Sequence, residues 1–287
     1  MKAIQFMHPG KEYLFPQKDR NIHYCQEKNI RYWNSKGKHF RKYLKASGEY
    51  LCNLSQNTQK GELYFWGEWE GASYYEKLNS DSPAYLHKPT LKYKPVKVVS
   101  NTDPFVFASN FYYTNCMQCS KKILRELQEN DLILFGSYSK QGFLLDTLFV
   151  VKSSKRFEEV KFNECPKALV ELTLKQLEKY KDCEPEIDLC KSVKKQNECK
   201  EWIFYEAKMF DDDKEYFSFV PCNIKLEGNN RHKRLLLNYG NDFIGLAKIT
   251  QGIKKLNLFN TKEIWKKIVD EALKQGFALA TSFEEIQ

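Results

Sequence analysis

DLILFGSYSKQGFLLDTLFVVKSS, residues 131–154, is the part of the sequence with the clearest structural pattern. Two apolar runs, 132–136 and 143–151, flank a short polar turn that ends in Gly142. Apolar runs of this length, joined by a polar turn with glycine, are typical of a β-hairpin. We therefore predict a hairpin at the centre of the core.

Further strands and helices are predicted on both sides of this hairpin. Strands are expected at 3–7, 61–69, 101–113, 202–210, 216–221, 233–239 and 243–249, and helices at 120–130, 166–181 and 260–275. Asn260 fits the N-cap of the last helix and Gly276 its end. The pattern predicts an α+β fold, a mixed β-barrel or strongly bent sheet with flanking helices.

Length and composition favour one compact unit with two regions. Residues 1–165 would hold a basic N-terminal region and the barrel core, and 166–287 a helix, an insertion, extra strands and the C-terminal helix. Apolar residues make up 42% of the 287 residues and charged residues 29%, which is typical of a folded protein.

The sequence predicts a cytoplasmic protein that does not enter a membrane. It has no uninterrupted apolar run of the ~18 to 20 residues that a membrane span needs. The opening residues MKAIQFMHPGKEY lack the apolar segment of an export signal, so the nine cysteines are expected to be reduced.

Positive charge is concentrated near the N-terminus. Residues 1–100 hold 17 Lys and Arg against 9 Asp and Glu, although the net charge of the whole chain is only +9. Within this region, the run 28–45 (KNIRYWNSKGKHFRKYLK) contains no acid and interleaves its cations with aromatic residues. Lysine and arginine displace counterions from phosphates, and aromatic rings stack on bases. The run therefore predicts a nucleic-acid surface, the alternative being a solvated basic face whose aromatic rings point into the core.

A base pocket would be formed by this run together with aromatic and amide side chains from elsewhere. The candidate nucleic-acid-binding residues are Arg31, Trp33, Asn34, Lys36, Lys38, His39, Arg41, Lys42, Trp66, Tyr113 and Asn115.

Four carboxylates and one histidine are candidates for catalysis. Alternation along 61–70 puts Glu68 and Glu70 on one face of a strand beside Trp66, and paired carboxylates can act as acid and base. Asp146 interrupts an apolar run, where an unpaired charge would be costly if buried. Asp103 precedes a proline, and His8 ends the first strand. The alternative for each carboxylate is a hydrogen bond or ion pair with nearby Lys, Arg or backbone N–H.

Neither a metal nor another cofactor is predicted. Cys116 and Cys119 form a CxxC, but no second CxxC follows. The glycine patterns of a P-loop or a dinucleotide-binding fold are also missing.

The segment from Leu124 to Val151 resembles the core of PUA-like domains of the EVE and ASCH type. In these families a Gly-Asp dipeptide leads into an apolar strand, and a second strand then closes a small barrel. Here Asn130 replaces the glycine before Asp131, and asparagine can adopt the same left-handed turn. The resemblance implies reading of modified bases or RNA, with a pocket bordered by residues just ahead of this turn, namely Tyr112, Tyr113, Asn115 and Cys116.

Three functional hypotheses follow. The first is a nucleic-acid or modified-nucleotide binding protein with a role in nucleic-acid modification or phage defence. The second is an enzyme acting on nucleic acid, a base-excising glycosylase or a nuclease, that uses the carboxylates in the same cleft. The third is an interaction protein that presents its aromatic surface to a protein partner.

Overall fold

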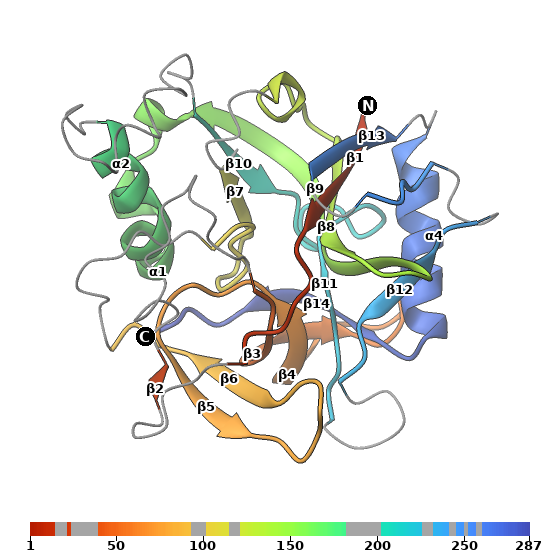
Figure 1. Cartoon of the computed structure of the whole chain (residues 1–287). Helices are drawn as coiled ribbons and strands as arrows, with labels where there is room; N and C mark the ends of the chain where they lie inside the picture. The colour runs from red at the N-terminus through yellow and green to blue at the C-terminus, as the bar shows by residue number, and fades with distance from the viewer. Residues whose placement is uncertain are drawn as a thin grey trace.

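The computed structural model of the chain is an α+β fold in which strands make up most of the regular structure (Figure 1). It describes residues 1–14, 22–23, 40–92, 102–114, 121–181, 202–225, 232–240, 245–249, 252–256 and 260–287. The strands of these ranges form two mixed sheets, and no closed barrel is found among them. In the same ranges, no helix has the length and apolar character needed to cross a membrane.

The first sheet is built around the hairpin expected from the sequence. Its order is β13–β1–β8–β9–β10–β7, and β12 also pairs with β9. Only β1 and β8 run parallel in it. The strands span Ala3–His8 (β1), Tyr112–Thr114 (β7), Leu132–Tyr138 (β8), Gly142–Arg156 (β9), Ile203–Ala207 (β10), Leu235–Asn238 (β12) and Gly252–Leu256 (β13).

The predicted hairpin is confirmed as the pair β8 and β9. Strand β8 has β1 on one side and β9 on the other, so it lies in the interior of the sheet. Its residues Leu132–Gly136 are buried, as are the β9 residues from Leu145 to Val151. Asn130, directly before β8, has a φ of 67°, which confirms the left-handed turn expected for it.

The second sheet consists mainly of strands that were not predicted. Its order is β11–β14–β3–β6–β5–β2, and β4 pairs with β3. Strand β4 confirms the strand expected at 61–69, although it ends two residues earlier. The strands span Ile22–His23 (β2), Lys42–Leu51 (β3), Gln59–Gly67 (β4), Ser73–Lys77 (β5), Tyr85–Pro89 (β6), Val220–Cys222 (β11) and Ala278–Phe283 (β14).

Helices are few among the described residues. The helix expected at 166–181 is present as α1 (Lys167–Leu169), a π-helical segment (Val170–Leu174) and α2 (Lys175–Lys181). The last helix, α4 (Thr261–Lys274), begins as predicted, because the side chain of Asn260 accepts a hydrogen bond from the backbone of Lys262. Helices α2 and α4 lie on opposite sides of the molecule (Figure 1).

Three predicted elements are wrong in extent or type. The expected helix at 120–130 is reduced to one short 3-10 helix at Lys122–Leu124, because Tyr205 Oη donates to the carbonyl of Leu124 and the chain turns toward β8. Of the strand expected at 101–113, only β7 forms at its end. Residues 245–249 contain no strand, and pairing with β1 begins instead at Gly252.

Strands from the two ends of the chain pair with each other in both sheets. In the first sheet β13 pairs with β1, and in the second β14 pairs with β3. A large buried cluster of apolar side chains, including Phe65, Phe107 and Phe135, lies between strands of both sheets. Both sheets and this buried cluster therefore contain residues from 1–165 and from 166–287.

Candidate functional site

Five ionisable side chains converge between the two sheets. They come from the end of β1, from the residues flanking β3 and β4, from β9 and from the residue before β12. Each is almost completely buried, and the side chain of Arg234 is 9% exposed. They are His8, Arg41, Glu68, Asp146 and Arg234.

Their contacts form one continuous chain of ion pairs. Arg41 is in the middle, with Nη1 2.7 Å from Glu68 Oε2 and Nε 2.9 Å from Asp146 Oδ2. His8 Nδ1 lies 3.2 Å from the same Glu68 oxygen. At the other end, Arg234 Nη2 and Nε donate to Asp146 Oδ1 at 2.5 and 3.1 Å. These ion pairs connect His8 and Asp146 of the first sheet with Arg41 and Glu68, which flank β3 and β4 of the second.

The two arginines differ in their electrostatic balance. Burial works against the charged form of Arg41, but the charges of Asp146 and Glu68 outweigh it and raise the pKa of this guanidinium above its usual value. Within the described part of the chain, Asp146 is the one carboxylate paired with Arg234, and burial together with the positive charge of Arg41 lowers the pKa of Arg234. Arg41 is thus the better stabilised cation.

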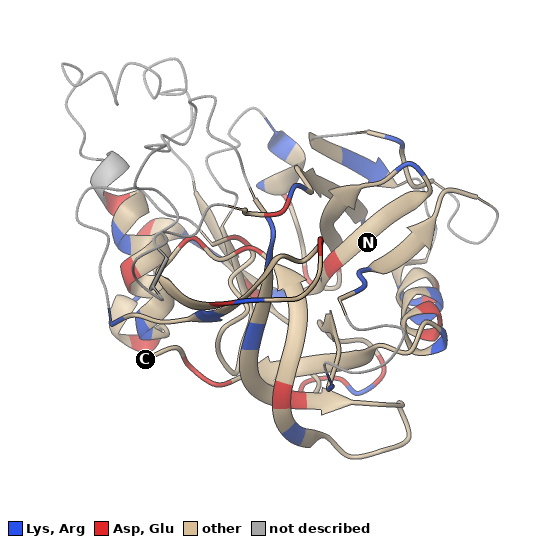
Figure 2. Ribbon diagram, turned by 60° about the horizontal axis from the view of Figure 1, so that its bottom comes forward, with Lys and Arg blue, Asp and Glu red and all other residues tan. Residues whose placement is uncertain are grey.

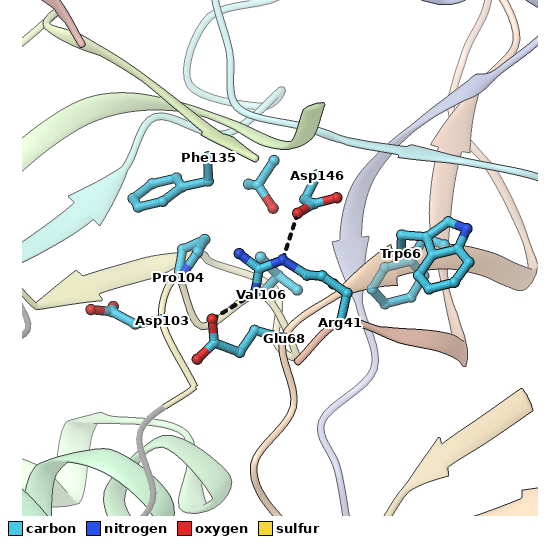
Figure 3. Close-up of a pocket in the computed structure, with 11 residues that line it drawn as sticks. Arg41, Trp66, Glu68, Asp103, Pro104, Val106, Phe135 and Asp146 are labelled. Atoms are coloured by element: carbon cyan, nitrogen blue, oxygen red, sulfur yellow. Dashed lines mark hydrogen bonds and ion pairs between the residues drawn. The ribbon is translucent and has the colours of Figure 1, made fainter. Parts of the chain in front are cut away.

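A pocket opens beside Arg41 (Figure 3). In this view Arg41 reaches between Asp146 and Glu68, with Phe135 and Trp66 on two sides. The interior leaves space for about one water molecule. The pocket is lined by Arg41, Phe65, Trp66, Gly67, Glu68, Asp103, Pro104, Val106, Phe135, Asp146 and Thr147.

Trp66 is held in place from several directions. Its Nε1 donates to the carbonyl of His232 at 2.8 Å, and the Arg234 guanidinium lies 5.7 Å from its ring. The Tyr43 ring is a further neighbour, with centroids 5.5 Å apart. Burial raises the pKa of Tyr43 to about 12, so its hydroxyl stays protonated. Trp66 therefore forms a fixed wall of the pocket.

The structure brings most of the predicted carboxylates together. Glu68, Asp103 and Asp146 line the pocket. Asp103 Oδ1 also accepts a hydrogen bond from the backbone of Thr114 at 3.2 Å. Glu70 is buried outside the lining, where its backbone N–H donates to Thr102 Oγ1.

Two predicted binding residues do not line the pocket. Tyr113 is a core residue, 1% exposed, stacked on Tyr205 with ring centroids 5.9 Å apart. Its ring also packs against Phe135 within the large buried cluster, so it serves the core. Lys42 is buried as well and is missing from the lining, because adjacent strand residues point to opposite faces.

The other predicted binding residues lie outside the described ranges. They are Arg31, Trp33, Asn34, Lys36, Lys38, His39 and Asn115. On the described part of the chain the surface charge is mixed, as α4 shows with bands of both signs (Figure 2). Within that part, no group of three or more His, Cys, Asp and Glu side chains is arranged to hold a metal ion.

Sequence reasoning missed Arg234. The strand expected at 233–239 contains it, and the observed register pairs Leu235 with Leu145. One step further along both strands, Arg234 comes beside Asp146. A cation at the start of one strand opposite an acid within another is the signal that could have identified this pair.

In comparisons with models of protein families, with curated proteins and with solved structures, the chain finds no relative. The resemblance to PUA-like domains accordingly stays a prediction, and the site has to be interpreted from its own geometry.

Proposed function

We propose that this protein binds nucleic acid and receives an unstacked base in the pocket between its two sheets. The observation that carries this proposal is the position of Arg41. This residue belongs to the basic and aromatic run 28–45, and its side chain reaches into a pocket with aromatic walls. A phosphate-binding segment that leads directly into such a pocket is the arrangement that base recognition needs.

The lining offers both kinds of contact that a base makes. Phe65, Trp66 and Phe135 supply apolar surface for its faces. Glu68 and Asp146 accept hydrogen bonds from exocyclic amino groups, and Arg41 donates to ring nitrogens and carbonyl oxygens. The ion pairs place these groups at the pocket before a ligand arrives.

The pocket has to widen to admit a base, because its interior leaves space for about one water molecule. Arg41 divides the space between Glu68 and Asp146. In our proposal the base displaces Arg41 from one of these carboxylates and offers an amino group in its place. Bases without a suitably placed amino group would then be bound more weakly.

A PUA-like core is part of the same proposal. It is supported by the hairpin of β8 and β9 and by the left-handed Asn130 before Asp131. The proposal includes a role in reading modified bases and a cytoplasmic location. Fold resemblance alone does not establish function, so the pocket bears the argument.

Fluorescence polarisation with single- and double-stranded DNA and RNA of equal length, over a series of salt concentrations, tests the proposal. We expect the logarithm of the binding constant to fall linearly with the logarithm of the salt concentration. Glu68→Gln should change the affinity for one base relative to another by roughly tenfold. The dependence of binding on salt concentration should stay the same. Lys274→Gln, on the exposed surface of α4, is the matched control. Absence of binding, or an identical base preference in the Glu68 variant, would refute the proposal.

The contact between His8 and Glu68 favours a second candidate, an enzyme that excises bases or cleaves nucleic acid. A histidine 3.2 Å from a carboxylate is a recurring acid–base arrangement. Incubation with labelled substrates, followed by heating in alkali to reveal abasic sites, separates the two functions. Product that disappears in Asp146→Asn and Glu68→Gln, with binding retained, supports catalysis. If the unmodified protein forms no product, binding alone remains.

A further inference from the structure

Lys42 is a second buried cation of the basic run. It follows Arg41 directly, but its side chain points to the other face of β3, away from the ion-pair chain. The side chain is 1% exposed, and Nζ makes no hydrogen bond to any residue that the structure describes. Lys42 takes part in none of the ion pairs found within the described ranges. The ring of Tyr13 lies 5.5 Å from Nζ.

His87 lies near Lys42 in the second sheet, because it pairs with Leu44, and residues two apart on a strand share a face. His87 on β6 is 1% exposed, and its Nδ1 lies 2.9 Å from Ser73 Oγ on β5. Burial, and after it the charge of Lys42, lowers the pKa of His87 well below 6.5. Glu12, the neighbour of Tyr13, uses its carboxylate to accept the backbone N–H of Ala84.

The surroundings do not compensate the charge of Lys42. Removal of an ammonium from water is costly unless hydrogen bonds and an opposite charge replace the lost hydration. A contact with one aromatic ring offsets only part of this desolvation free energy. Arg41, one residue earlier, shows the usual solution, with two carboxylates around one cation.

We propose that Lys42 forms the charged part of a buried oxyanion site, which takes a group of the phosphate class against the ring of Tyr13 and the face of the sheet that carries His87 and Ser73. Lys42 is not among the residues that line the pocket, and the site is independent of what the pocket binds. The phosphate group could be free or part of a nucleotide or an oligonucleotide, all of which offer the same oxygens to the ammonium.

Isothermal titration with inorganic phosphate, and thermal unfolding in phosphate against chloride at equal ionic strength, test the site. We expect saturable binding of about one phosphate per chain and a rise in Tm of roughly 5 °C at phosphate a hundredfold above its Kd. Lys42→Met, which keeps the length of the side chain, should abolish both. Lys45→Met is the matched control, because Lys45 on the same strand is paired with Glu62 and partly exposed.

Two further titrants identify the source of the phosphate. If a nucleoside monophosphate or a short oligonucleotide binds the unmodified protein more tightly than inorganic phosphate, and Lys42→Met loses the advantage, the site takes an esterified phosphate. If inorganic phosphate binds as well as either, the site takes the free anion. Absence of binding of all three in the unmodified protein overturns the proposal, as does a phosphate response that Lys42→Met retains. Neither result bears on base recognition, which is tested by Glu68→Gln.

Discussion

Arg41 Nε lies 2.9 Å from Asp146 Oδ2, and this contact joins the two sheets across the pocket. Arg41 directly precedes β3 of the second sheet, and Asp146 lies on β9 of the first. Both side chains are buried, and each has a second partner of opposite charge, Glu68 for the arginine and Arg234 for the aspartate. The stability of the sheet interface should therefore depend on the whole chain of ion pairs.

Replacement of Arg41 should be strongly destabilising. Arg41→Met leaves Glu68 buried without its arginine and Asp146 with one partner instead of two. Breaking a buried ion pair on one side typically costs about 3 to 5 kcal/mol, so we expect a loss of this size in the free energy of unfolding. Urea denaturation followed by tryptophan fluorescence measures it. Lys161→Met, which breaks an exposed pair with Glu164, should change the same quantity by less than about 0.5 kcal/mol. Equal effects of the two substitutions would contradict this reading.

Arg234→Met should cost less than Arg41→Met when introduced alone, because Asp146 keeps Arg41. In the double variant Asp146 is left buried without any arginine. We therefore expect the double variant to lose about 0.5 to 3 kcal/mol more than the sum of the two single losses. Adding Asp146→Asn to the double variant removes the unpaired charge and should restore part of the stability. Additive losses in urea denaturation would show that the two arginines do not share Asp146.

Elements that are specified by neighbouring residues in the sequence were predictable, and elements that depend on distant partners were not. The hairpin of β8 and β9 was predictable because its apolar runs and its turn are contiguous. Strand β3 was not, because Arg41 and Lys42 at its start are residues that usually lie on the surface. Their burial depends on partners from distant parts of the chain, such as Asp146 on β9.

The candidate site was predictable in part for the same reason. Glu68, Asp146 and His8 stood out as polar residues within or at the end of apolar strands, and the structure places all three in one chain of ion pairs. Tyr113 was expected in the pocket because aromatic residues serve cores and binding surfaces alike, and its burial beside Tyr205 could not be read from its neighbours in sequence. Contact partners, rather than residue types, were the missing information.

Gly136 should be intolerant of any side chain. It lies at an irregularity in the pairing of β8 with β9, next to the pocket residue Phe135. A Cβ atom there would overlap the backbone carbonyl oxygen of Leu144. We expect Gly136→Ala to lower the free energy of unfolding by about 1 to 3 kcal/mol, because the backbone of the hairpin has to shift. Gly240→Ala is the control, since a Cβ at Gly240 has no neighbouring atom within 4 Å. A Gly136 variant as stable as the Gly240 variant in urea would show that β8 can adjust freely.

Titration of His87 should make the protein less stable in mild acid. Burial, and after it the charge of Lys42, lowers the pKa of His87 well below 6.5, the value expected for the unfolded chain. Between these two pKa values the unfolded state binds more protons than the folded state, so the contribution of His87 to stability is complete above about pH 7 and is lost as the pH falls through 6.5.

The largest slope that one histidine can cause is about 1.4 kcal/mol per pH unit. His87→Gln should remove this slope, and Lys42→Met should reduce it, because the neighbouring charge is one cause of the low pKa. Urea denaturation of the three proteins at several pH values from about 7.5 to 5 measures the effect, and the difference between curves isolates His87 from carboxylates that titrate in all of them. Parallel curves for the unmodified protein and His87→Gln would mean that His87 takes up its proton equally in the folded and unfolded states.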